Sequence, residues 1–153
     1  MTTSLSIARA LVLGSFGAFL AWSDLRNRRI PNQGIALFTI ASAAVYILKP
    51  SEFLAATACA ILFATLLFPI SLLRHKGLGG GDIKLIIALA LLLGRGSHIL
   101  SMLILASLFG LLHLTIEGIR LKSIPRSIAF APALIGAAFL SLYWTVDEEL
   151  KRH

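Results

Sequence analysis

The chain has 153 residues, enough for one domain, of which 58% are hydrophobic and only 14% are charged. Soluble domains carry about a quarter charged residues, so this balance, with a mean hydropathy of +0.89, indicates a protein of the lipid bilayer. The net charge of +7 would suit nucleic-acid binding, but the basic residues stand in short clusters between apolar runs, as they do beside membrane spans, and we exclude nucleic acid. The single cysteine, Cys59, excludes an intrachain disulfide and a thiolate metal cluster.

Six uncharged runs follow one another and predict an all-α polytopic membrane protein with about six transmembrane helices in one domain, residues 1–153. A spanning helix needs about 20 residues, because each adds about 1.5 Å across a core of about 30 Å. We predict spans at about 5–24, 33–48, 53–73, 80–96, 97–117 and 127–146. The uncharged parts of the first and fourth are too short to span alone. The first can extend back past Arg9 or forward to include Asp24, and the fourth must recruit residues from the stretch Gly79 to Lys84, so we expect each helix to carry an aspartate at or just inside the membrane surface. An ionisable residue at that depth is costly and is a candidate functional residue.

The basic residues predict the orientation of these spans. The connections after the first, third and fifth spans hold nine of them: Arg26, Arg28, Arg29, Arg74, Lys76, Lys84, Arg120, Lys122 and Arg126. The opposite side holds five: Arg9, Lys49, Arg95, Lys151 and Arg152. Because cytoplasmic loops are rich in Lys and Arg, we expect the first group to face the cytoplasm. Asp24 ends the first span and Asp82 begins the fourth, so both carboxylates are expected at that same face.

Each aspartate stands in a distinctive segment. Asp24 is followed by three arginines and then by Pro31, which opens the next helix; an ordinary helix end with a basic cluster would look the same. The run Gly79-Gly80-Gly81 precedes Asp82. Glycines allow close backbone approach, so this run predicts an open segment on which another chain can lie. The alternatives are a plain loop with Asp82 as the helix N-cap, or a phosphate-binding loop, which lacks its strand and its Lys-Ser/Thr pair here.

The pair of carboxyls predicts acid–base chemistry. Two neighbouring carboxyl groups cannot both ionise readily, so one remains an acid while the other acts as a base. The base activates a water against a peptide carbonyl, and the acid protonates the oxygen or the leaving amine. Neither a metal ion nor a nucleophilic side chain is needed, and we expect no cofactor. The chain contains no HExxH or GxSG motif and no cysteine near a polar partner.

Two features of the last two spans are less specific. Pro132, within Phe130-Ala131-Pro132-Ala133-Leu134, would free backbone groups in the sixth span, either for a substrate strand or in a packing kink. His113 and Glu117 lie one turn apart in the fifth span, as in a proton relay or an interhelical contact.

Together these motifs resemble the type IV prepilin peptidases, GxGD aspartyl proteases of prokaryotic inner membranes (leader peptidase family A24). The segment from Asp24 to Ile30-Pro31-Asn32 looks like the family's first catalytic aspartate with its basic tail. The segment from Gly79 to Lys84 looks like its GxGD-x-K motif, and Phe130 to Gly136 like its proline-containing last helix. The resemblance implies Asp24 and Asp82 as the catalytic pair. It also implies a further set that shapes the site or seats the substrate: Gly79, Gly80, Gly81, Lys84, Pro132 and Leu134.

The resemblance further implies a substrate. Such enzymes remove the short basic leader from prepilins and pseudopilins on the cytoplasmic side, just before the hydrophobic helix. Charge alone does not explain how a basic leader meets an already basic loop. Larger members carry paired CxxC motifs and an N-methyltransferase activity. This chain, with one cysteine, resembles the short peptidase-only form of tight-adherence pilus systems, so methylation and zinc are not expected.

Two other functions fit parts of the sequence. A related GxGD protease could cut inside transmembrane helices rather than at a leader junction. A small carrier or proton-coupled channel could use Asp82, His113 and Glu117. The sequence leaves the oligomeric state open.

Overall fold

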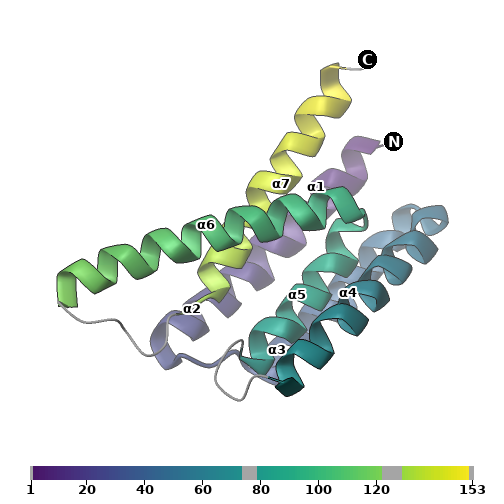
Figure 1. The fold of residues 1–153 in the computed structure, drawn as a ribbon. Helices are drawn as coiled ribbons and strands as arrows, with labels where there is room; N and C mark the ends of the chain where they lie inside the picture. The colour runs from purple at the N-terminus through teal and green to yellow at the C-terminus, as the bar shows by residue number, and fades with distance from the viewer. Residues whose placement is uncertain (1, 74–78, 122–128, 152–153) are drawn as a thin grey trace.

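The computed structural model describes residues 2–73, 79–121 and 129–151 (Figure 1). Helices are the only regular secondary structure in these three ranges, and several are long and apolar enough to cross a bilayer. The prediction of an all-α polytopic membrane protein is confirmed. Part of the charge pattern that predicts the orientation falls outside the described residues: Arg74, Lys76, Lys122, Arg126 and Arg152.

Each of the first two predicted spans is a continuous helical stretch in which the type of helix changes along the chain. The first consists of α1 (Thr2–Val12), a π-helical turn η1 (Leu13–Gly17) and α2 (Ala18–Asn27). The second consists of α3 (Asn32–Ala44) and the 3₁₀ turn η2 (Val45–Leu48). A further short turn, η3 (Pro50–Glu52), leads into α4 (Phe53–Leu73).

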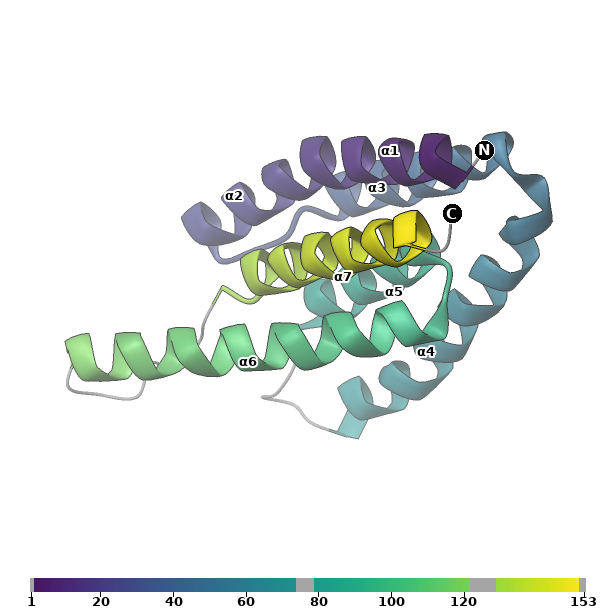
Figure 2. The same cartoon turned by 90° about the horizontal axis from the view of Figure 1, so that it is seen from above.

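The second half of the chain forms three more helices: α5 (Gly80–Leu93), α6 (Gly96–Leu121) and α7 (Ala131–Lys151). Because successive helices reverse direction, α1 begins and α7 ends at one end of the molecule, as Figures 1 and 2 show. The end of α2 and the starts of α5 and α7 lie at the other end.

Among the described residues, three segments are long and apolar enough to cross a membrane: Ser4–Asn27, Pro50–Pro69 and Gly96–Arg120. Two shorter apolar helices, Asn32–Leu48 and Ala131–Trp144, accompany them. The large side chains of α4 and α6 are widely exposed, such as those of Leu54, Ile61, Ile104, Leu108 and Ile119. Lipid tails solvate such side chains as well as a protein core does, so these faces suit the bilayer.

The short helix α5 lies at the centre of the bundle. It packs most extensively against α3 and α4 and also contacts α6 and α7. Leu85, Leu89 and Leu92 are completely buried, and the positions from Ile83 to Leu93 are buried except Lys84 and the partly buried Ile87. A helix that is apolar all round is expected inside a bundle. Its central position explains how a helix with so short an uncharged run is accommodated, since protein rather than lipid surrounds it.

A cluster of polar groups fastens the far end of α5. The hydroxyl of Tyr46 donates to the Leu91 carbonyl over 2.7 Å and accepts from Arg9 Nη2 over 3.2 Å. Arg9 also stacks on the Tyr46 ring and pairs with Glu52 at 3.5 Å. Gly94 ends α5 with φ of +72°, and a side chain there would collide with the Tyr46 hydroxyl. The cluster joins α1, η2 and η3 to the carboxyl end of α5.

The last helix begins later than the sequence predicts. Residues 129 and 130 are not helical, and α7 starts at Ala131, so Pro132 occupies its first turn. The N–H groups of a first turn have no partner within the helix, so a proline there removes no helical hydrogen bond. Pro132 therefore marks a helix start, and the expected packing kink inside a span does not form.

Candidate active site

Asp24 lies in the last turn of α2 and, with only 6% of its surface exposed, is one of the few buried polar residues in the described ranges. Its Oδ2 accepts a hydrogen bond of 3.0 Å from the backbone N–H of Ala131, the first residue of α7. The first N–H groups of a helix carry a partial positive charge, which suits a carboxylate. The packing of α2 against α7 thus holds the Asp24 side chain in place.

The chain reverses direction at the end of α2, one helical turn after Asp24. Arg28 has a left-handed backbone with φ of 50°, and its N–H donates to the Asp24 carbonyl over 2.7 Å, which ends α2. The Ser23 hydroxyl donates to the Arg29 carbonyl over 3.3 Å. Pro31 then stands immediately before α3. This compact turn keeps the basic side chains exposed while Asp24 remains buried.

Asp82 is the third residue of α5 and is partly buried. The N-cap of this helix is Gly79, not Asp82, and the Asp82 carboxylate reaches back to hydrogen-bond the Gly79 backbone. Oδ2 of Asp82 lies 3.1 Å from the point that a Cβ on residue 79 would occupy. A glycine at position 79 therefore gives this carboxylate its room, while no atom of the described residues lies within 4 Å of the corresponding point on Gly80.

The structure brings the segments around the two aspartates together at one end of the bundle. The carboxylates of Asp24 and Asp82, 58 positions apart in sequence, lie within electrostatic range of each other. Gly81 faces Ile30, in the turn that follows Asp24. A Cβ atom on residue 81 would lie 3.4 Å from the Cβ of Ile30. The Lys84 ammonium donates to Asn32 Oδ1 over 2.9 Å, which links the starts of α5 and α3.

This arrangement, a pair of neighbouring carboxyls at helix ends, coincides with a match to a known family. The profile of the type IV leader peptidase family matches residues 11–115, which include both aspartates. The chain belongs to this family. Comparisons with curated proteins and with solved structures return no match.

This type IV leader peptidase family member is therefore a membrane protein from a family of aspartic-type peptidases. The family match ends within α6, so it does not include the start of α7. The contact between Ala131 and Asp24 nevertheless makes α7 part of the candidate site. In the described residues, no group of three or more His, Cys, Asp and Glu side chains could hold a metal ion.

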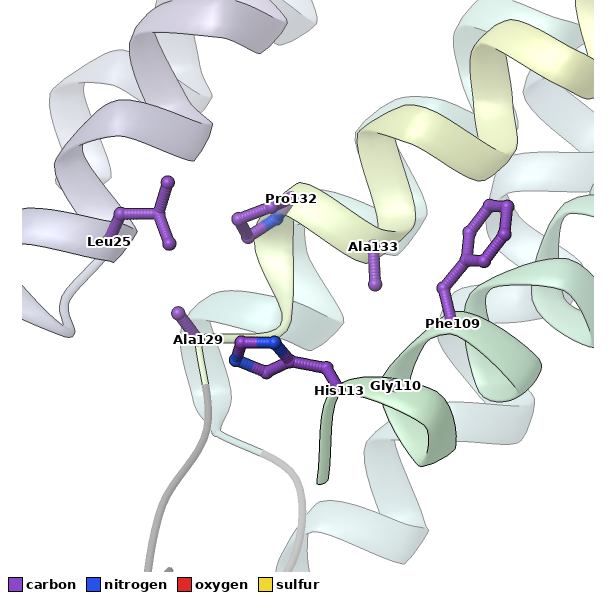
Figure 3. A pocket seen from close by; sticks show the side chains of 7 residues that line it. All are labelled: Leu25, Phe109, Gly110, His113, Ala129, Pro132 and Ala133. Carbon is purple, nitrogen blue, oxygen red and sulfur yellow. The ribbon is translucent and has the colours of Figure 1, made fainter. Parts of the chain in front are cut away.

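A pocket of about 250 Å³ opens beside the start of α7 (Figure 3). Residues from three parts of the chain line it: Leu25, Phe109, Gly110, His113, Ala129, Pro132 and Ala133. Figure 3 shows the His113 imidazole reaching from α6 towards Ala129 and Pro132, with Leu25 on the opposite side. The pocket thus lies between the end of α2, the start of α7 and the middle of α6.

The other residues singled out by the sequence occupy varied positions. Pro132 lines the pocket, whereas Leu134 is fully buried in the core. His113 and Glu117 approach each other, with 3.9 Å between Nε2 and Oε1, and both side chains are partly exposed. This spacing is that of a loose pair on one helix face.

One member of the site was missed by the sequence analysis. The N–H of Ala131 was not identified as a partner of Asp24, since a backbone group has no signature in the residue type. The only signal was Pro132, because proline is common in the first turn of a helix. Reading it as a helix start would have indicated free N–H groups nearby.

Proposed function

We propose that this family member is a membrane aspartic endopeptidase that removes the basic N-terminal leader from type IV prepilin-like or pseudopilin-like precursors. It acts at the cytoplasmic face of the inner membrane, with Asp24 and Asp82 as its catalytic pair. The observation that carries the proposal is the buried Asp24 carboxylate, hydrogen-bonded to Ala131 and within electrostatic range of Asp82. The single-domain organisation of residues 1–153 is part of the same proposal.

The chemistry follows from two carboxyl groups that share one proton. The ionised carboxylate removes a proton from a water, whose oxygen attacks the scissile carbonyl. The protonated carboxyl gives its proton to the leaving amine as the C–N bond breaks. The products are the leader with a new carboxylate and the precursor with a new amino terminus.

The segments beside the pair are proposed to seat the substrate. Gly79, Gly80 and Gly81 place no side chain beside Asp82, and no atom of the described residues lies within 4 Å of the point that a Cβ on residue 80 would occupy. An extended peptide can approach such a segment closely. Lys84 holds this segment to α3 through Asn32, while Pro132 and Leu134 shape the start of α7.

The test is cleavage of a co-expressed precursor, followed by gel shift, for the wild type, Asp24→Asn and Asp82→Asn at equal membrane abundance. The wild type should release the leader, and each variant should lose about 10²–10⁴-fold in rate, because a general acid or base contributes that much. Full cleavage by either variant would refute the mechanism.

The same assay separates the two alternatives. Mass spectrometry of the products should map the cut between the leader and the hydrophobic helix; a cut deep in the helix would indicate an intramembrane protease. If the wild type cleaves none of several precursors, ion or solute flux in liposomes becomes the test of a carrier or channel.

A further inference from the structure

A second pocket, of about 410 Å³, lies beside the turn between α3 and α4, at the end of the bundle where α1 begins (Figure 2). Its walls are Ala43, Tyr46, Ile47, Pro50 and Phe53. Ile47 is 80% exposed and Phe53 is 43% exposed, so the pocket opens to the surroundings of the bundle. Its volume lies within the range of about 300–1,000 Å³ that is usual for ligand sites. The walls are apolar apart from the Tyr46 hydroxyl, which is bonded to Leu91, so the pocket accepts an apolar group.

A cluster of cationic side chains adjoins this pocket. Arg9 stacks on the ring of the wall residue Tyr46. Arg9 and Lys49 both pair with the Glu52 carboxylate, and Arg95 lies within electrostatic range of the same group. Three cations and one carboxylate give this cluster a net charge of +2. Nε of Arg9 is also buried without a hydrogen-bond partner among the described residues. The cluster is therefore suited to a further anion.

Two of these cations stand at the boundaries of apolar segments. Lys49 separates Asn32–Leu48 from Pro50–Pro69, and Arg95 directly precedes Gly96–Arg120. Lys and Arg side chains near the ends of membrane helices reach the interface, where the lipid headgroups lie. A lipid with an acyl chain in the pocket would thus have its phosphate at the level of Lys49 and Arg95.

We propose that this pocket and its basic cluster bind one anionic phospholipid, with an acyl chain along the pocket walls and the phosphate beside Lys49 and Arg95. An amphiphile with an anionic head uses both the apolar walls and the surplus of positive charge. A second copy of this chain would bring the same surplus to the contact, and like charges oppose association. The Tyr46 hydroxyl joins the cluster to the carboxyl end of α5, so the bound lipid stabilises the packing of this helix. The site stands whatever reaction the two aspartates catalyse.

The first test concerns the charge of the lipid. Native mass spectrometry of the purified protein in a neutral detergent measures the binding of dioleoyl-phosphatidylglycerol, which is anionic, and of dioleoyl-phosphatidylcholine, which has no net charge. The wild type should bind its first phosphatidylglycerol about tenfold or more tightly than phosphatidylcholine. Arg95→Gln and Lys49→Gln should each weaken phosphatidylglycerol about fivefold and leave phosphatidylcholine unchanged. Arg120→Gln removes the same charge from an exposed position at the end of α6 and, as the matched control, should bind both lipids like the wild type.

The second test concerns the acyl chain. Ala43→Phe fills the pocket without changing its charge and should weaken both lipids about tenfold, whereas Ala58→Phe, at an exposed position of α4, should weaken neither. Ala43→Leu repeats the comparison if Ala43→Phe does not accumulate. Phosphatidylglycerol should also raise the apparent Tm of the wild type, as a ligand of the folded state does, and should raise that of Arg95→Gln less.

Several results would overturn the site. Equal affinity of the wild type for both lipids, or an equal loss in Arg95→Gln and Arg120→Gln, would show that the cluster does not select an anionic head. Normal phosphatidylglycerol binding in Ala43→Phe would show that the acyl chain lies elsewhere. Displacement of the lipid by inorganic phosphate would reduce the site to one for a free anion. A mass of two chains that Ala43→Phe reduces to one would assign the pocket to a second copy instead.

Discussion

At the residue scale, the candidate site depends on how each carboxylate is held. The Asp24 carboxylate accepts a hydrogen bond from the Ala131 N–H at the start of α7. The Asp82 carboxylate is hydrogen-bonded to the backbone of Gly79, which caps α5. In both cases a backbone group at a helix N-terminus faces the carboxylate, where the helix dipole favours negative charge. The site therefore depends on backbone positions as much as on the two aspartates.

The Ala131 N–H can be removed with little disturbance of the helix. Ala131→Pro deletes the donor to Asp24, while proline is well tolerated at the first helical position. Ala131→Gly retains the donor and is the control. We expect Ala131→Pro to cleave a precursor about tenfold or more slowly than Ala131→Gly, since small misplacements of catalytic groups are costly. Equal rates, with equal thermal stability of the two proteins, would show that this hydrogen bond does not position Asp24.

Gly79 offers a second test at the same scale. A methyl group in Gly79→Ala would lie 3.1 Å from Asp82 Oδ2 and displace the carboxylate by a few tenths of an ångström. Gly96→Ala, also at a helix start, meets no atom of the described part of the chain within 4 Å and is the matched control. We expect Gly79→Ala to lower kcat by about tenfold and Gly96→Ala to leave it unchanged. Normal kcat in Gly79→Ala would mean that Asp82 is not fixed by the close approach of residue 79.

At the scale of elements, α5 must remain in place because it carries Asp82 at one end. Its sides pack in the core, and its far end is tied to α1 and η2 by Arg9 and Tyr46. The last carbonyls of a helix have no hydrogen-bond partner within it. The Tyr46 hydroxyl provides such a partner by donating a hydrogen bond to the Leu91 carbonyl.

Loss of that hydroxyl should weaken the whole bundle. Tyr46→Phe leaves the Leu91 carbonyl and one Arg9 donor without the bonds they make in the structure. We expect a loss of about 1–3 kcal/mol of stability, measured as a lower apparent Tm in detergent. Tyr143→Phe, at an exposed tyrosine of α7, is the control and should leave the Tm unchanged. A similar Tm for both variants would mean that the cluster does not stabilise α5.

At the scale of the whole molecule, the alternation of helix directions brings Asp24 and Asp82 to one end and the Tyr46 cluster to the other. The orientation proposed from the charge pattern turns the aspartate end towards the cytoplasm. The exposed apolar faces of α4 and α6 suit contact with lipid tails.

Labelling can test this orientation. Cys59→Ser removes the single cysteine, and Asn27→Cys or Ser97→Cys then places one thiol at an exposed site at either end. A membrane-impermeant maleimide should label the Ser97→Cys protein on intact cells and the Asn27→Cys protein only after permeabilisation. The reverse pattern would place the aspartates on the outer side and exclude cleavage at the cytoplasmic face.

Much of this molecule can be predicted from local sequence. The apolar runs indicate the helices because burial in lipid depends on the hydrophobicity of consecutive residues. The segments around Asp24 and Asp82 identified the family, which the profile match confirms. The shared end of the two aspartates followed from the number of spans between them, since each span reverses the chain direction.

The tertiary structure decided the contacts that give these residues their surroundings. Ala131 is 107 positions from Asp24, and its N–H carries no signature of residue type, so only the packing of α2 on α7 reveals the bond. Likewise, three separate segments enclose the pocket beside Pro132. Sequence alone determined which segments are apolar and which charges accompany them, because those are local properties. The partners of each carboxylate depend on how distant helices pack, and only the fold could supply them.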